Sequence, residues 1–125
     1  MEKNIKLATS QKNINIVLNN TKTAKDISGI LPLDARAQVW GNEIYFSIPL
    51  HNDLEDGKEI VDIGDVAYWP PGNAFCIFFG KTPESTSEKP KAASPVTVIG
   101  KIAEKADIKY LKSVKQGQQI QLKPE

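Results

Sequence analysis

The residues best suited to binding chemistry lie in a predicted β-hairpin that covers residues 35–48. Its two-residue loop is Gly41-Asn42, and a glycine at the first loop position favours a primed turn, which determines the strand register. In that register one face carries charged, amide, hydroxyl and aromatic groups together: Arg36, Gln38, Trp40, Glu43, Tyr45 and Ser47. We call these six residues the polar-aromatic face. Its rings offer stacking surface and its charged groups offer polarity, so it is a candidate site for a peptide or a small polar ligand.

A structural interpretation of the same pattern is also open, and it is the more ordinary one. The opposite side of the hairpin is apolar and predicts a core face: Ala35, Ala37, Val39, Ile44, Phe46 and Ile48. Antiparallel strands with one apolar face commonly present the other face to water. On this interpretation Arg36 lies along Tyr45, Trp40 packs under a loop, and the face binds nothing.

A second candidate is the pair Tyr68-Trp69 followed by Pro70-Pro71. Two aromatic side chains and two prolines at a loop tip can form the rim of a cleft that faces a ligand. The alternative is a turn that anchors one end of the fold, with both aromatic side chains half-buried. Together with the hairpin, this rim gives the predicted ligand-binding set: Arg36, Gln38, Trp40, Glu43, Tyr45, Tyr68 and Trp69.

Other chemistry finds little support in the sequence. Cys76 stands in an apolar run with no neighbouring histidine or cation, so its thiol is expected to be poorly ionised and structural. His51 is expected to be a solvated loop residue, and turn chemistry explains Asp62 and Asp65 on either side of Gly64. No phosphate-binding glycine loop, triad spacing or zinc-ligand spacing is present, so we predict no catalytic residue, no metal and no cofactor.

Residues 64–83 are the stretch around which the other elements are expected to assemble. Two apolar runs, residues 65–69 and 74–79, flank a Pro-Pro-Gly-Asn turn and predict a β-hairpin. Gly72 is expected to supply the positive φ of a type II turn. Both faces of the second run are apolar, with Cys76 and Phe78 on one face and Phe75 and Ile77 on the other, so we expect a strand that is buried on both faces.

The remaining chain predicts short strands and two short helices. Strands are expected at residues 4–8, 13–18, 59–62, 96–101 and 119–123, and a long mobile loop at residues 83–95. One helix begins at a cap formed by Asn20 or Thr21 and stops before Pro32. The second contains Ile108, Leu111 and Val114. About eight strands and two capping helices favour a single mainly-β domain over residues 1–125, closed into a barrel.

Composition restricts the classes of partner. Sixteen basic and fifteen acidic residues give a net charge of +1, with no basic block, so nucleic-acid binding is not expected. One cysteine excludes an intramolecular disulfide. The sequence has no apolar signal core and no run of membrane-spanning length, which predicts a cytoplasmic protein without a membrane partner. The oligomeric state stays open.

Three blocks of the sequence resemble a bacterial and archaeal cyclophilin-like family of small proteins. They are Trp-Gly-Asn-Glu-Ile-Tyr-Phe (residues 40–46), the central stretch (residues 64–83) and Ala-Ser-Pro-Val-Thr-Val-Ile-Gly-Lys (residues 93–101). The resemblance implies a prokaryotic protein with a cyclophilin-like closed β-barrel, from a family without an established activity. The Phe-His-Arg and Gln-Gly-Gly runs of the true cyclophilins have no counterpart here, so no catalytic residue carries over, and fold alone does not imply isomerase activity.

These observations lead to two functional hypotheses. The first is a non-catalytic binding module for a small molecule or a peptide, which uses the polar-aromatic face and the Tyr68-Trp69 rim. The alternative is a divergent peptidyl-prolyl cis-trans isomerase, for which Arg36 beside Gln38 faintly resembles the electrostatic pair of the true isomerases.

Overall fold

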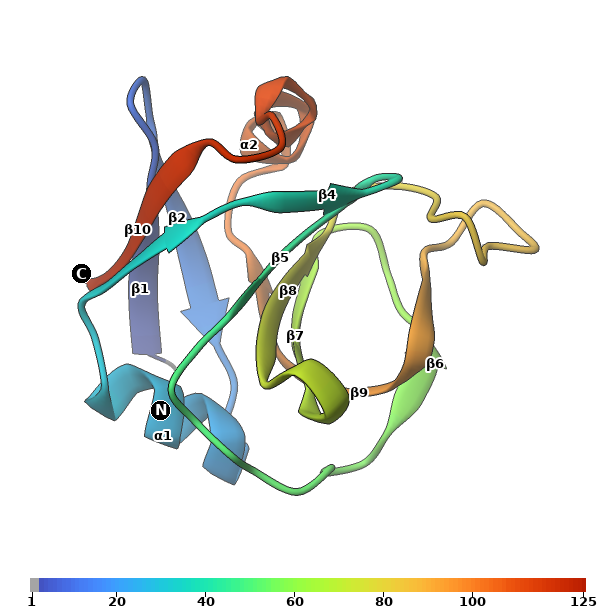
Figure 1. The fold of residues 1–125 in the computed structure, drawn as a ribbon, viewed down its shortest axis with the longest axis horizontal. Helices are drawn as coiled ribbons and strands as arrows, with labels where there is room; N and C mark the ends of the chain where they lie inside the picture. The colour runs from blue at the N-terminus through green and yellow to red at the C-terminus, as the bar shows by residue number, and fades with distance from the viewer. Residues whose placement is uncertain (1–2) are drawn as a thin grey trace.

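A computed structural model describes residues 3–125, which form ten strands, two α-helices and two short 3₁₀ turns (Figure 1). The strands are β1 (Lys3–Ala8), β2 (Asn13–Leu18), β3 (Leu33–Arg36), β4 (Gln38–Trp40), β5 (Glu43–Ser47), β6 (Lys58–Ile60), β7 (Asp65–Trp69), β8 (Ala74–Phe78), β9 (Lys91–Ile102) and β10 (Gln119–Pro124). The helices are α1 (Lys22–Gly29) and α2 (Lys105–Tyr110), and the 3₁₀ turns are Pro70–Gly72 and Leu111–Ser113. The fold is therefore mainly β with two helices, as predicted. Neither helix in the described part of the chain is long and apolar enough to cross a membrane.

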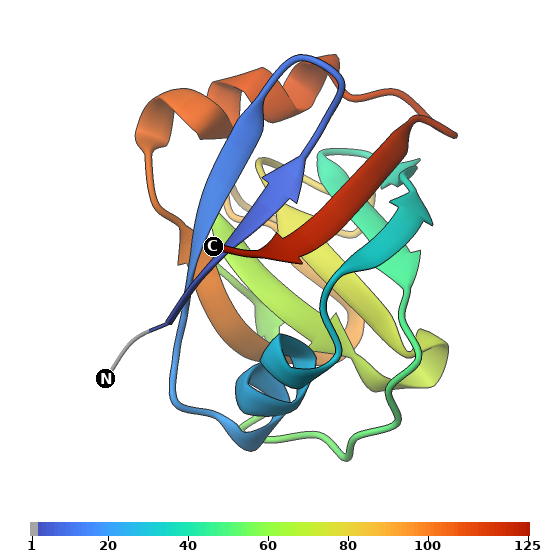
Figure 2. The same cartoon turned by 90° about the vertical axis from the view of Figure 1, so that its left-hand side faces the viewer.

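The strands form one strongly curved sheet, in the order β3-β10-β1-β2-β9-β7-β8-β5-β4, with β6 paired to β9 (Figure 2). The two end strands, β3 and β4, are not hydrogen-bonded to each other, so the predicted closed barrel is not confirmed. They are consecutive in the chain and are joined by Ala37, whose backbone exchanges hydrogen bonds with Gly117 and Gln118 at 2.7 and 2.8 Å. The strand to which the chain is hydrogen-bonded thus changes at Ala37, from β10 for β3 to β5 for β4. No ladder joins the two end strands of the sheet.

This change of partner corrects one predicted pairing. Trp40 lies opposite Glu43 and Gln38 lies opposite Tyr45, as the Gly41-Asn42 loop predicts. Arg36, however, pairs with Gln119 of β10 rather than with Ser47 of β5. The predicted hairpin assumed one continuous strand along residues 35–40, whereas its first part belongs to the other end of the sheet.

The concave side of the sheet holds the main core, and the helices lie at its two opposite ends (Figures 1 and 2). Thr21 caps α1, since its hydroxyl accepts a 3.1 Å hydrogen bond from the backbone N–H of Ala24. Ile27 from α1 and Leu111 and Val114 after α2 are buried in this core. The predicted capping role of the helices is confirmed.

Strand β8 is buried along its whole length, as predicted from its two apolar faces. Phe75 and Ile77 point into the main core. Cys76 and Phe78 belong to a second core cluster on the outer face, completed by Val61, Ala67, Ala74, Ala92 and Val96. This second cluster is covered by an arm in which the first part of β9 pairs with β6. The arm also borders the pocket described below.

Two local predictions are wrong. In the turn between β7 and β8, Pro70–Gly72 forms a 3₁₀ turn and the positive φ, 48°, belongs to Asn73 rather than to Gly72. Asparagine tolerates this left-handed conformation better than most residues, which explains the exchange.

The predicted loop over residues 83–95 is also shorter than expected, because β9 begins at Lys91. Hydrogen bonds close the connection: the Ser85 hydroxyl donates to the carbonyl of Lys89 at 2.8 Å and accepts from the backbone N–H of Lys91 at 3.2 Å. Residues 91–95 (Lys-Ala-Ala-Ser-Pro) contain no large apolar side chain, so their alternation was too weak to indicate a strand.

Candidate ligand-binding pocket

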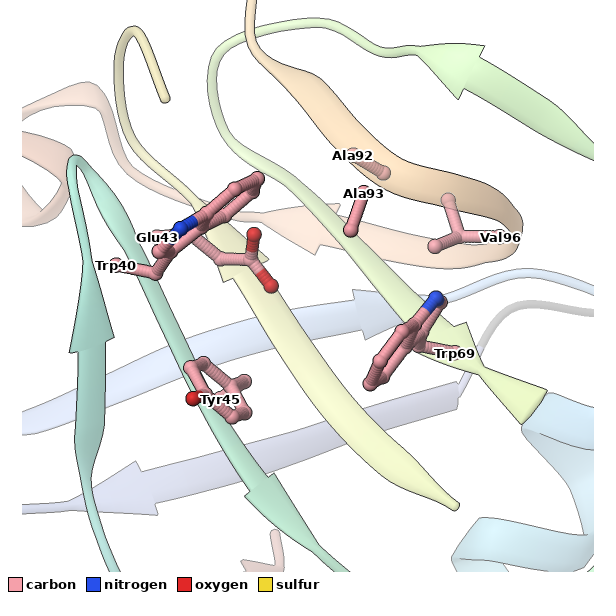
Figure 3. A pocket seen from close by; sticks show the side chains of 7 residues that line it. All are labelled: Trp40, Glu43, Tyr45, Trp69, Ala92, Ala93 and Val96. Atoms are coloured by element: carbon pink, nitrogen blue, oxygen red, sulfur yellow. The ribbon is translucent and has the colours of Figure 1, made fainter. Parts of the chain in front are cut away.

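A pocket of about 250 Å³ lies on the outer face of the sheet, between the β4–β5 hairpin and the arm formed by β6 and β9 (Figure 3). Seven side chains line it: Trp40, Glu43, Tyr45, Trp69, Ala92, Ala93 and Val96. Three of these are aromatic, three are small or branched aliphatic and one is a carboxylic acid. The lining is therefore mostly apolar, with the Glu43 carboxyl group and the Tyr45 hydroxyl as its main polar groups.

Trp69 forms one side of the pocket and is held in place from two directions. Its indole N–H donates a 2.7 Å hydrogen bond to the hydroxyl of Ser94 in β9. The ring also packs directly over Gly72, where an added Cβ would lie 2.8 Å from a ring carbon. A glycine at position 72 thus leaves the space that the indole occupies, and the ring orientation is established before any ligand arrives.

Trp40 and Tyr45 come from the β4–β5 hairpin, across the pocket from Trp69 (Figure 3). Both are half-buried, so each presents part of its ring to the pocket while the rest packs on the protein. Tyr45 lies opposite Cys76 in the strand register and packs against the second core cluster. The hairpin register therefore brings two of the three rings to one place.

Glu43 is the most unusual residue of the pocket, because only 6% of its surface is exposed. Its carboxyl group points toward the space that the other lining side chains surround (Figure 3). Burial raises the pKa of Glu43 from the ordinary 4.5 to about 7, and hydrogen bonding to the Cys76 thiol opposes this only in part. Of the ion pairs among residues 3–125, none includes Glu43.

Cys76 lies beneath this acid and is fully buried. Burial raises the pKa of its thiol well above the ordinary range, and the negative charge of Glu43 raises it further. A thiol that stays protonated is a poor nucleophile. Its thiol donates a weak 3.8 Å hydrogen bond to the carbonyl of Ala74, so Cys76 is a packing residue beneath the pocket.

Comparison with known proteins places this chain in a family. The profile described as Cyclophilin-like matches residues 3–123, which is nearly the whole described chain. The chain belongs to the Cyclophilin-like family. The structure is also similar to the solution structure of a hypothetical protein from Archaeoglobus fulgidus, with a TM-score of 0.81 and 33% sequence identity, over 99% of this chain and 95% of that one. Among curated proteins no match is found.

In this cyclophilin-like chain four of the seven predicted ligand-binding residues meet at the pocket: Trp40, Glu43, Tyr45 and Trp69. The other three lie elsewhere. Gln38 is exposed beside Tyr45 without lining the pocket, and Arg36 donates a 3.2 Å hydrogen bond from Nη1 to the carbonyl of Gly117. Tyr68 points to the other face of β7 into the main core, where its hydroxyl donates to the carbonyl of Leu50 at 2.7 Å. Tyr68 and Trp69 thus lie on opposite faces of the sheet.

Sequence reasoning missed the aliphatic wall of the pocket, formed by Ala92, Ala93 and Val96. Two of these residues lay within the predicted loop, which hid their position opposite the hairpin. A usable signal existed, because Val96 is spaced from Ala92 as residues on one face of a strand are. Both side chains are indeed buried in the second cluster.

A second, smaller hollow lies beside α1 and is lined by Lys22, His51, Asn52, Asp53, Leu54 and Glu55. Here the Glu55 carboxylate already accepts the backbone N–H groups of Lys22 and Thr23, at 3.1 and 2.8 Å, and the Thr23 hydroxyl at 2.7 Å. These contacts satisfy N–H groups that a helix leaves free at its first turn. We therefore interpret Glu55 as a structural cap of α1 rather than as a ligand-binding residue.

Proposed function

We propose that this cyclophilin-like protein is a non-catalytic binding protein that takes a small ligand, or one side chain of a peptide, in the pocket between Trp40, Tyr45 and Trp69. The observation that carries the proposal is the convergence of three aromatic rings and one acid on a single apolar hollow. Ligand sites typically combine apolar and aromatic walls with few polar groups that orient the ligand.

The size of the pocket supports a small ligand. Drug-sized ligands usually occupy pockets of about 300–1,000 Å³. The pocket here, at about 250 Å³, suits a single chemical group or a short side chain. The hydrogen bond from Trp69 to Ser94 supports the proposal as well, because a ring held in place before binding loses little entropy when the ligand enters.

The alternative function, a divergent peptidyl-prolyl isomerase, has less support. Arg36 and Gln38, the pair that this alternative requires, do not line the pocket. A proline-isomerisation assay on short aromatic-proline peptides tests it, and turnover that disappears in Arg36→Ala would favour the isomerase.

A cytoplasmic location and the absence of a nucleic-acid partner belong to the proposal. The near-neutral net charge of +1 supports the second of these.

The two tryptophans of the chain provide a direct test, because both line the pocket. A fragment library is screened by intrinsic tryptophan fluorescence, and hits are titrated against Trp69→Phe and Tyr45→Ala. We expect both variants to fold and to lose affinity for the hits. Gln38→Ala is the matched control, since Gln38 lies opposite Tyr45 but outside the pocket. A library without any hit, or hits that bind all variants equally, would refute the proposal.

A further inference from the structure

We infer that the ligand group received by this pocket is an alkylated ammonium cation, with its charge against Glu43 and its alkyl groups against the aromatic rings. The inference rests on the proposed binding function and adds the chemical class of the ligand. It follows from the charge of the pocket, the nature of its rings and the small number of its hydrogen-bonding groups.

The charge of the pocket is the first argument. Glu43 is the only charged residue among the seven that line it, and no cation of the described chain pairs with it. An ionised carboxylate buried to this extent is costly unless a positive charge compensates it. A cationic ligand supplies that charge, whereas a neutral ligand would leave the acid protonated or uncompensated.

The rings are the second argument. A cation over the face of tryptophan or tyrosine is attracted by the ring quadrupole, and tryptophan is the best of the aromatic side chains for this purpose. Trp40, Tyr45 and Trp69 approach the pocket from two sides, with the Glu43 carboxyl group between them (Figure 3). Several rings around one acid favour a cation over an anion, which the carboxylate would repel.

The hydrogen-bonding groups of the pocket decide which cation fits. A primary ammonium carries three N–H donors and a guanidinium carries five, all of which need acceptors when buried. The pocket offers the Glu43 carboxylate and the Tyr45 hydroxyl as acceptors, and the rest of its wall is aromatic or aliphatic. A quaternary ammonium has no N–H to satisfy, and its methyl groups match Ala92, Ala93 and Val96. The geometry therefore favours alkylated over unsubstituted cations.

The experiment compares choline with its neutral carbon isostere, dimethylbutanol, by tryptophan fluorescence titration of the full chain. The pH is kept well above 7 so that Glu43 is ionised. We expect choline to bind about tenfold more tightly or better. Nα-acetyl-trimethyllysine amide forms a second arm, because a preference for it over choline would indicate a peptide side chain as the source of the cation. Nα-acetyl-arginine amide is a third arm, and tighter binding of this probe than of choline would overturn the inference.

The variant Glu43→Gln keeps the shape of the side chain and removes its charge. We expect it to lose about tenfold in affinity for choline while binding of dimethylbutanol stays unchanged. Glu104→Gln, an exposed acid before α2, is the control and should bind both probes like the wild type. Equal affinities for choline and dimethylbutanol would overturn the inference and leave the proposed binding function intact. Failure of choline to bind also overturns it, and the fragment screen then shows independently whether the pocket binds anything.

Discussion

The carboxyl group of Glu43 lines the pocket and the thiol of Cys76 is buried near it, and each affects the ionisation of the other. Hydrogen bonding to the thiol lowers the pKa of Glu43, which burial has raised to about 7. The charge of Glu43 in turn adds to the effect of burial in raising the pKa of Cys76. One of the two groups thus titrates near neutrality, and the other stays protonated.

This relationship predicts that stability depends on pH. The pKa of Glu43 is higher in the folded chain, about 7, than its ordinary value of 4.5, so folding favours the protonated acid. The contribution of Glu43 to the free energy of unfolding is fully present below the ordinary value and is lost as the pH rises through about 7. From the difference between these two values we expect a loss of roughly 3 kcal/mol.

Urea denaturation of the wild type and of Glu43→Gln across this pH range measures the effect. The variant cannot ionise, so its stability should fall less with pH and should exceed that of the wild type above neutrality. Two curves that remain parallel over the whole range would show that Glu43 titrates normally.

Phe78 tests the second core cluster. Its ring is fully buried on the outer face of β8, so Phe78→Ala should lower the free energy of unfolding by about 3–5 kcal/mol. Ile60→Ala is the control, because Ile60 is 50% exposed on β6 and should cost little. The two values come from the same chemical denaturation experiment. A cost under about 1 kcal/mol for Phe78→Ala would mean that the arm does not bury this strand.

Glu55 tests the cap of α1. Its carboxylate accepts the N–H groups of Lys22 and Thr23, so Glu55→Ala should lower stability by about 1 kcal/mol, as the loss of a capping side chain does. The pKa of Glu55 is lowered, chiefly by the Thr23 hydroxyl, so its contribution is present above the ordinary value and disappears as the pH falls through the lowered pKa. Glu59→Ala, an exposed acid, is the control. An equal effect of both substitutions would argue against the cap.

Gly72 tests the support of Trp69. A methyl group at position 72 would lie 2.8 Å from the indole ring, so Gly72→Ala should displace the ring and weaken ligand binding. Gly29→Ala is the matched control, since an added Cβ there meets no atom within 4 Å and should stabilise α1 by about 0.5–1 kcal/mol. The emission of Trp69, recorded in a Trp40→Phe background, reports the displacement. Unchanged emission and affinity in Gly72→Ala would show that the ring position is set elsewhere.

Much of the fold could be predicted from local pattern. The alternating residues of β1, β2 and β10, and the two apolar faces of β8, indicate strands without tertiary information. The partner change at Ala37 could not be predicted, because residues 35–40 alternate as one strand and nothing in the sequence marks where the pairing moves from β10 to β5. The arm formed by β6 and β9 could not be predicted either, because the side chains with which it covers the second core cluster, such as Ala92, are small.

The candidate site could also be predicted only in part, because local pattern determines some of its residues and remote contacts determine the others. The Gly41-Asn42 register places Trp40, Glu43 and Tyr45 on one face, and this needs only local information. The burial of Glu43 depends on the arm from β9, which is remote in sequence, so the pattern indicated an exposed acid. Tyr68 was assigned to the same site as Trp69, although neighbouring residues of a strand point to opposite faces.

The central claim, that this pocket binds a ligand, is tested most directly by the indole N–H signals of the ¹⁵N-labelled protein. The chain has two tryptophans, so the spectrum contains two such signals, and both belong to residues that line the pocket. We predict that a titration with the tightest-binding hit of the fragment screen shifts the signals of Trp40 and Trp69 with one common dissociation constant. Saturable shifts confined to other residues, with both indole signals unmoved, would contradict the claim.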